Sequence, residues 1–188
     1  MCLHPKVQLR LRQEIREHLP SPESGTEVTA ADIERLPYLN AVCTEILRYF
    51  PPVPVAAQRE AIKDTTVLGH VIPKGTHIYV FQWATNHDQA LWGPDASVFD
   101  PERWIKNPSG GKVSNFADLT FIHGPRGCIG ERFARGEFAS LLGAFVGKFE
   151  FRLADESLYD ESKVPIKGGV VSKMRDGCWT RVKQVPGW

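Results

Sequence analysis

The residues best suited to chemistry lie in the ten-residue stretch Phe121 to Gly130, which reads Phe-Ile-His-Gly-Pro-Arg-Gly-Cys-Ile-Gly. Its three glycines remove side-chain bulk and permit positive φ, so a flat ligand could approach this backbone closely. Cys128 offers a reactive sulfur at the start of a predicted helix. Backbone N–H groups and the positive helix end favour a thiolate, the form that binds soft metals or attacks electrophiles.

Two interpretations of Cys128 follow from the residue types alone. Free cysteines usually behave as small buried hydrophobes, and a tight glycine-rich loop could hold Cys128 in that way. The nearby Arg126 instead favours a ligand site, because its guanidinium is a permanently charged fork that binds carboxylates. The residue chemistry leaves both interpretations open.

The stretch resembles the haem-binding signature Phe-x-x-Gly-x-Arg-x-Cys-x-Gly of the cytochrome P-450 superfamily. Five positions carry the resemblance: Phe121, Gly124, Arg126, Cys128 and Gly130. In that family the cysteine thiolate is the axial ligand of the haem iron and pushes electron density toward O–O cleavage. The resemblance therefore implies that Cys128 is the metal ligand at the catalytic centre and that the other four positions help to hold the haem.

Composition indicates one ordinary globular domain over residues 1–188, since 42% of the residues are hydrophobic and 24% are charged. The formal net charge of +1 gives no argument for a nucleic-acid partner. The four cysteines form no C-x-x-C pair, so neither a zinc site nor a disulfide scaffold is predicted, and a reducing compartment fits. The sequence shows neither an apolar run of membrane-spanning length nor a signal peptide, which predicts a soluble or peripheral chain.

Hydrophobic periodicity predicts two helices in the first third of the chain. Between Pro5 and His18, apolar residues recur at helical spacing among charged ones. A short helical turn is expected near residues 31–36. Pro37 opens the second helix, which carries an apolar stripe and must end before the prolines that begin at Pro51.

Glu45 and Arg48 lie three residues apart on the second helix and are therefore neighbours on its surface. One interpretation is a solvated ion pair worth a few tenths of a kcal/mol. The tetrapeptide also resembles the Glu-x-x-Arg of the family's K helix, and Arg103 matches the later arginine that joins this pair. The resemblance implies a structural triad of Glu45, Arg48 and Arg103 that fixes the register of the haem loop rather than adding stability.

Beyond the prolines, residues 53–59 begin an extended stretch, and residues 66–81 contain two β-branched segments typical of a small sheet. In the family, this region lines the substrate pocket and carries an arginine to a haem propionate, a position that Arg59 matches. The implied pocket wall for a small organic substrate consists of Val53, Val55, Ala56 and Ala57. Ordinary strand core is the alternative interpretation of these four residues.

Four features are expected in the second half of the chain. Residues 86–104 resemble the family segment that leads into the meander, and a polar loop follows over residues 106–117. The longest helix should begin after Cys128 and back the haem, with an apolar side formed by Phe133, Leu141, Leu142, Phe145 and Phe149. Residues 166–173 and 178–185 flank Arg175-Asp-Gly177, a sequence typical of a hairpin turn. A short strand is expected at residues 149–153.

The expected fold is mainly α with small β-sheets, similar to the C-terminal part of the cytochrome P-450 fold. It comprises the K helix, small sheet, meander, Cys loop, L helix and terminal hairpin. Nothing in the sequence resembles the family's distal oxygen-handling helix, its Trp-x-x-x-Arg helix, or the N-terminal anchor by which eukaryotic members are commonly held at the endoplasmic reticulum. We therefore expect no controlled oxygen activation from this polypeptide by itself.

Three functional hypotheses remain open. The first is a haem-thiolate monooxygenase that inserts one atom of O₂ into an organic substrate, using electrons from an NAD(P)H-dependent reductase that docks near the proximal loop. The second is a truncated, non-catalytic remnant that binds haem weakly. The third is a structural or interaction domain in which Cys128 is buried and unliganded.

Overall fold

The computed structural model describes residues 1–160, 164–167, 171–175 and 177–188. About 41% of the chain is helical and 15% is strand, which confirms the mainly α fold with small sheets. The helical elements are α1 (Pro5–His18), η1 (Pro22–Ser24), α2 (Ala30–Glu34), α3 (Pro37–Tyr49), α4 (Gln82–Asn86), α5 (Gln89–Trp92), α6 (Glu102–Lys106), η2 (Asn115–Ala117), α7 (Glu131–Lys148) and η3 (Glu156–Tyr159). The strands are β1 (Ala56–Glu60), β2 (Thr65–Val67), β3 (His70–Ile72), β4 (His77–Val80), β5 (Phe149–Leu153), β6 (Ile166–Lys167), β7 (Lys173–Met174) and β8 (Thr180–Gln184).

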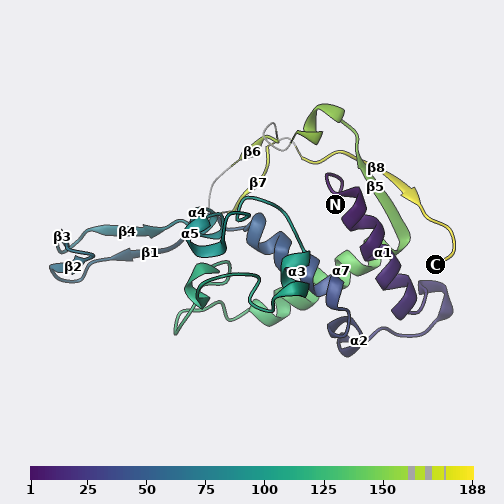
Figure 1. The fold of residues 1–188 in the computed structure, drawn as a ribbon, viewed down its shortest axis with the longest axis horizontal. Coiled ribbons are helices and arrows are strands. Elements are labelled where there is room, and N and C mark those ends of the chain that lie inside the picture. The colour runs from purple at the N-terminus through teal and green to yellow at the C-terminus, as the bar shows by residue number, and fades with distance from the viewer. Residues whose placement is uncertain (161–163, 168–170, 176) are drawn as a thin grey trace.

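Helices α1, α3 and α7 pack together around the larger hydrophobic core (Figure 1). Both α1 and α3 begin with proline, which lacks the N–H that a first helical turn cannot use. Leu11 and Ile15 of α1 and Leu39 and Val42 of α3 are completely buried there. The periodicity of these two segments thus predicted both the helices and the faces that they bury.

Side chains of α1 also tie the core to the chain beyond α7. Gln8 accepts a hydrogen bond from the Phe151 amide and donates one to the Phe151 carbonyl. Arg12 donates to the carbonyls of Val146 and Phe149, while Arg16 donates to the backbone beyond β8. These contacts fix the C-terminal end of α7, so that α7 is held at both its core face and its end.

The expected apolar side of α7 is only partly right. Leu142 packs against the larger core, but half or more of Phe133, Leu141 and Phe145 is exposed. The buried residues of the helix are instead Ala139, Gly143, Val146 and Gly147. A Cβ on Gly147 would lie 2.4 Å from the Trp188 ring, so small residues contribute to this face through the close approach that they permit.

The strands form four two-stranded antiparallel sheets. The pairs β1–β4 and β2–β3 make an arm that extends away from the helices (Figure 1). A second, smaller core lies between this arm and the long helices and consists of Trp92, Ala96 and Ala117, with Leu91 and Trp104 packed against it. This second core holds the chain segment that leads into the Cys loop.

The pairing of the C-terminal strands differs from the expected hairpin. Residues 180–184 pair with β5, with Phe151 opposite Val182, and the two residues of β6 pair with β7. Asp176 of the predicted turn lies outside the described residues. The physical reason is that β5 leaves α7 with an open edge and alternating apolar residues, and β8 satisfies the backbone groups of that edge.

Candidate functional site

The Cys loop, residues 121–130, is closed by hydrogen bonds within its own backbone. The Cys128 amide donates to the Phe121 carbonyl across 2.8 Å, and the Gly127 amide donates to Gly124 across 2.9 Å. Gly124 has φ of +90°, a conformation in which a Cβ would be strained. The loop thus brings the first and eighth residues of the signature into direct contact and places Cys128 at its rim.

Cys128 is exposed, so the interpretation of this residue as a buried hydrophobe is wrong. That description fits Cys43 of α3, which is 5% exposed and whose pKa is raised to about 12 by burial. A buried thiol with so high a pKa remains protonated and unreactive at neutral pH. Of these two thiols, Cys128 is the one that a ligand can reach.

The surroundings of Cys128 fit a flat, largely apolar ligand with a soft metal at its centre. Ile129 is completely exposed and Phe133 is 75% exposed, so apolar side chains lie on both α7 and the loop beside the sulfur. The space where a Gly124 Cβ would stand is open. Helix α7 begins three residues after the sulfur and is 18 residues long, so the sulfur lies near the positive N-terminal end of a long helix. These features fit haem, and Cys128 as its protein ligand stays a prediction.

In the part of the chain that the structure describes, no three His, Cys, Asp or Glu side chains gather as a metal-ligand group. The loop itself carries two side chains of a metal-ligating type, Cys128 and His123.

The remaining cofactor and pocket residues lie either in the loop itself or in and just before β1. Arg126 is exposed within it. Arg59 is exposed on β1, where its guanidinium donates to the Gln58 carbonyl across 3.0 Å. Val53 and Val55 are half-buried just before β1. Ala56 and Ala57 begin β1, with Ala56 opposite Val80. Among the described residues, the structure shows no contact between Arg59 and the loop, and the pocket assignment stays a prediction.

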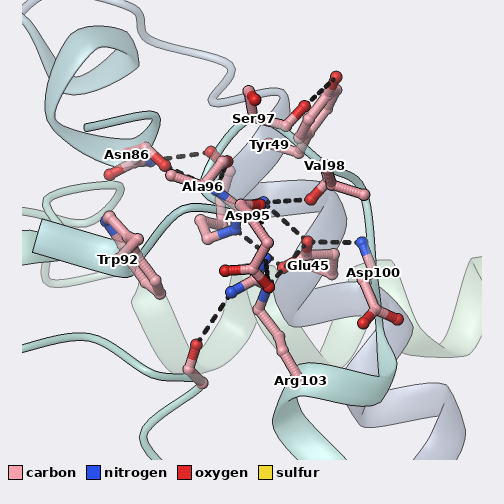
Figure 2. A network of polar contacts seen from close by, with 12 residues as sticks. Glu45, Tyr49, Asn86, Trp92, Asp95, Ala96, Ser97, Val98, Asp100 and Arg103 are labelled. Atoms are coloured by element: carbon pink, nitrogen blue, oxygen red, sulfur yellow. Dashed lines mark hydrogen bonds and ion pairs between the residues drawn. The ribbon is translucent and has the colours of Figure 1, made fainter. Parts of the chain in front are cut away.

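Glu45, Arg48 and Arg103 form a buried polar network behind this region (Figure 2). Glu45 is 0% exposed, Arg48 1% and Arg103 6%, so the interpretation as a solvated surface pair is wrong. Arg48 donates from Nε and Nη2 to the two oxygens of Glu45 across 2.9 and 2.8 Å, a bidentate pair. Arg103 Nε lies 3.3 Å from Glu45 Oε1. The structure thus brings the predicted triad together.

Both arginines also donate hydrogen bonds to backbone carbonyls. Arg48 donates to Asn86, Ala96 and Val98 across 2.6 to 3.0 Å. Arg103 donates to Gly110 across 3.2 Å and to Asp95 across 2.9 Å. Because these carbonyls belong to the last residue of α4 and to the loops that follow it, the two guanidiniums set the path of the chain between β4 and the Cys loop.

Three members of the network were not predicted from the sequence. The Asp95 carboxylate forms an ion pair with Arg103 across 3.0 Å. The Asp100 backbone amide donates to Glu45 Oε1, and Trp104 Nε1 donates to Glu45 Oε2. Asp95 balances the charge, since the triad alone has two cations and one anion. That imbalance was a usable signal, because buried charges need partners.

Asn86 and Thr120 connect the network to the start of the Cys loop. The side-chain amide of Asn86 donates from Nδ2 to the Arg48 carbonyl and to Thr120 Oγ1, both across 3.0 Å. Thr120 Oγ1 in turn donates to the Leu47 carbonyl. Because Thr120 immediately precedes Phe121, the entrance to the loop is fixed directly on α3.

A cavity of about 150 Å³ lies beside the loop, lined by Phe121, Ile122 and six polar side chains, among which are the carboxylates Asp118 and Glu131. Arg135 of α7 lies over the Phe121 ring at 4.9 Å and pairs with Glu131 across 2.9 Å. Lys112 and His123 contribute further donors to the same wall. This face of the loop is therefore polar, in contrast to the apolar surroundings of Ile129 and Phe133.

Comparisons with known proteins agree with this geometry. The family model described as Cytochrome P450 matches residues 1–174. The cytochrome P450 monooxygenase sphH of Aspergillus fumigatus is 45% identical across 100% of this chain and 35% of its own length. The cytochrome P450 monooxygenase FUM15 of Gibberella moniliformis is 41% identical across 98% of this chain and 38% of its own length. The solved structure of retinoic acid bound cyanobacterial CYP120A1 superposes with a TM-score of 0.83 at 29% identity, covering 98% of this chain and 40% of that one.

The chain spans little more than a third of the length of these curated relatives. Within the described part of the chain, the helices are too short or too polar to cross a bilayer. The matched range includes the Cys loop and the whole of the buried network. From its sequence and its fold alike, the chain belongs to the cytochrome P450 family.

Proposed function

We propose that this chain supplies the thiolate side of a haem-dependent monooxygenase, with Cys128 as the axial ligand of the iron. The observation that carries the proposal is an exposed cysteine in a self-bonded glycine loop at the N-terminus of an 18-residue helix, flanked by apolar side chains. When bound, haem would supply the site for O₂ activation in the longer protein, and Cys128 would donate electron density to its iron. The amides of Cys128 and Gly127 hold the loop backbone by donating to the carbonyls of Phe121 and Gly124.

The other signature residues have supporting roles in this proposal. Gly124 and Gly130 allow the ligand to approach the backbone, and Arg126 and Arg59 offer charge to its propionates. Val53, Val55, Ala56 and Ala57 line part of the pocket for a small organic substrate. Glu45, Arg48 and Arg103 hold the loop from behind. These are assignments by position in the family's motifs. Exposure supports the roles of the loop residues, and the hydrogen bonds given above support that of Glu45, Arg48 and Arg103. The roles of Arg59 and of the pocket residues rest on the resemblance alone.

The same proposal places an NAD(P)H-dependent reductase on the face of the loop that carries the cavity beside Phe121. Lys112 and Arg135 line this cavity together with Asp118 and Glu131, and Arg135 pairs with Glu131. Lys112 is then the cation of this wall that an acidic docking surface would meet. Charge reversal at Lys112 should slow electron transfer, and the loss should shrink at high salt.

Two experiments test the proposed function at different levels. Haem titration of the isolated chain should give saturable binding that Cys128→Ser weakens strongly, while Cys178→Ser, at another exposed thiol, leaves it unchanged. A longer protein that contains these residues should then oxygenate an organic substrate when given NAD(P)H and reductase. Haem binding that is indifferent to Cys128, or full-length turnover that survives Cys128→Ser, would refute the proposal. Haem binding without turnover in the longer protein would favour the non-catalytic remnant.

A further inference from the structure

The indole of Trp104 makes a second link between Glu45 and the chain that follows α6. Glu45 Oε1 accepts hydrogen bonds from Arg48, Arg103 and the Asp100 amide, whereas Oε2 accepts from Arg48 Nε and Trp104 Nε1, each across 2.9 Å. Trp104 therefore supplies one of the two donors to an oxygen of a completely buried carboxylate. Loss of the indole would leave Arg48 Nε as the one remaining donor to Oε2 among the described residues.

The ring of Trp104 also fixes Gly110. A Cβ built on Gly110 would lie 2.7 Å from the ring, so the ring occupies the space that any other residue at position 110 would need. Gly110 has φ of +63°, and its carbonyl accepts from Arg103 Nη1 across 3.2 Å. Arg103 and Trp104 are consecutive, and each of them contacts both Glu45 and Gly110.

From Trp104 the packing continues toward the Cys loop. Its ring meets Trp92 edge to face, with centroids 5.9 Å apart. Trp92 is 1% exposed and donates from Nε1 to the carbonyls of Thr85 and Ala117. Ala117 is completely buried and precedes Phe121, the first signature residue, by four positions. The contacts therefore run without a break from Glu45 to the chain that enters the loop.

We propose that Trp104 is a positioning residue of the haem site. Its N–H orients Glu45 Oε2, and its ring locks Gly110 and Trp92, so that Cys128 is presented in one geometry. This inference rests on the proposed function, because it assigns Trp104 an effect on the ligand that Cys128 binds. The indole N–H, which a phenyl ring lacks, is the group that makes the difference.

The test compares Trp104→Phe with Trp179→Phe, an identical substitution at a side chain that is 78% exposed. In the haem-loaded chain, Trp104→Phe should release haem to apomyoglobin about tenfold faster, as expected for one lost hydrogen bond to a buried charge. The reduced carbon monoxide complex should also lose part of its red-shifted Soret band. Trp179→Phe should match the wild type in both respects. Wild-type release and spectrum in Trp104→Phe would overturn the proposal.

A measurement without haem separates this inference from the proposed function. Hydrogen exchange followed by mass spectrometry should be about tenfold faster for the Asp100 and Gly110 amides in Trp104→Phe than in Trp179→Phe. If the wild-type chain takes up no haem, the proposed function fails, and exchange alone decides whether Trp104 positions Glu45. Equal exchange in the two variants would overturn that part too.

Discussion

Removing Arg103 should destabilise the chain far more than removing a nearby surface cation. Arg103 is 6% exposed and donates to Glu45, Gly110 and Asp95. Breaking a buried ion pair by deleting one partner costs about 3–5 kcal/mol. Because Glu45 retains its bidentate contact with Arg48, we expect Arg103→Leu to lie at the lower end, about 3 kcal/mol. Leucine keeps most of the volume, so the loss reports the polar contacts.

The matched control is Lys106→Leu, one turn later on α6 and exposed. Surface substitutions usually change the free energy of unfolding by less than about 0.5 kcal/mol. Urea unfolding of both variants, followed by far-ultraviolet circular dichroism, measures the difference. With a slope of about 2 kcal/mol per molar urea, Arg103→Leu should lower the midpoint by about 1.5 M.

Haem retention adds a second comparison between the same two variants. If the network fixes the register of the Cys loop, Arg103→Leu should release haem faster than Lys106→Leu in the absence of urea. Equal unfolding midpoints for Arg103→Leu and Lys106→Leu would refute the energetic reasoning. Equal haem retention, with Arg103→Leu still destabilised, would refute the link from the network to the loop.

Two further predictions concern packing and pH. Gly147→Ala should destabilise by about 1 kcal/mol or more in thermal unfolding, because its Cβ would meet the Trp188 ring at 2.4 Å and an Ile15 methyl at 3.0 Å. Gly136→Ala, in the same helix but with open space around its Cβ, should instead stabilise by about 0.5–1 kcal/mol, and the opposite order would contradict the packing of α7. Since burial raises the pKa of Cys43 to about 12 from 9.0, the folded state retains a proton that the unfolded chain loses. Stability should therefore fall as pH rises from 9 toward 12, less steeply in Cys43→Ala, and an equal slope in unfolding titrations would contradict this assignment.

Local sequence signals predicted the helices whose cores rest on apolar periodicity. Pro5 and Pro37 marked the helix starts, and the apolar spacing of α1 and α3 marked their buried faces. The face of α7 could not be predicted in this way, because Gly143 and Gly147 contribute to packing through the close approach that they permit. Hydrophobicity scales give no weight to such contacts, and they directed the prediction to Phe145 instead.

The pairing of strands far apart in the chain could not be predicted from the sequence either. The turn signal at Gly177 is local, whereas the pairing of β8 with β5 depends on which strand edge remains open after α7 has packed. The side-chain contacts of Gln8 and Arg12 with distant backbone are invisible for the same reason. Each depends on where two segments far apart in the chain come to lie.

The sequence pointed to the signature loop and to the Glu45–Arg48 pair, but not to all the residues that surround them. The signature around Cys128 and the spacing of Glu45 and Arg48 were readable because each is contiguous or nearly so. Asp95 was not found, although two cations facing one buried anion already required another carboxylate. Trp104 was not found because an indole donor has no spacing rule, and only its contact with Glu45 shows its place.

The most direct test of the account is the spectrum of the haem-loaded, reduced chain under carbon monoxide, recorded beside Cys128→Ser and Cys178→Ser. We predict a red-shifted Soret band, typical of thiolate ligation, that persists in Cys178→Ser and disappears in Cys128→Ser. A band that survives Cys128→Ser, or none in the wild-type chain, would contradict the assignment of Cys128 as the haem ligand.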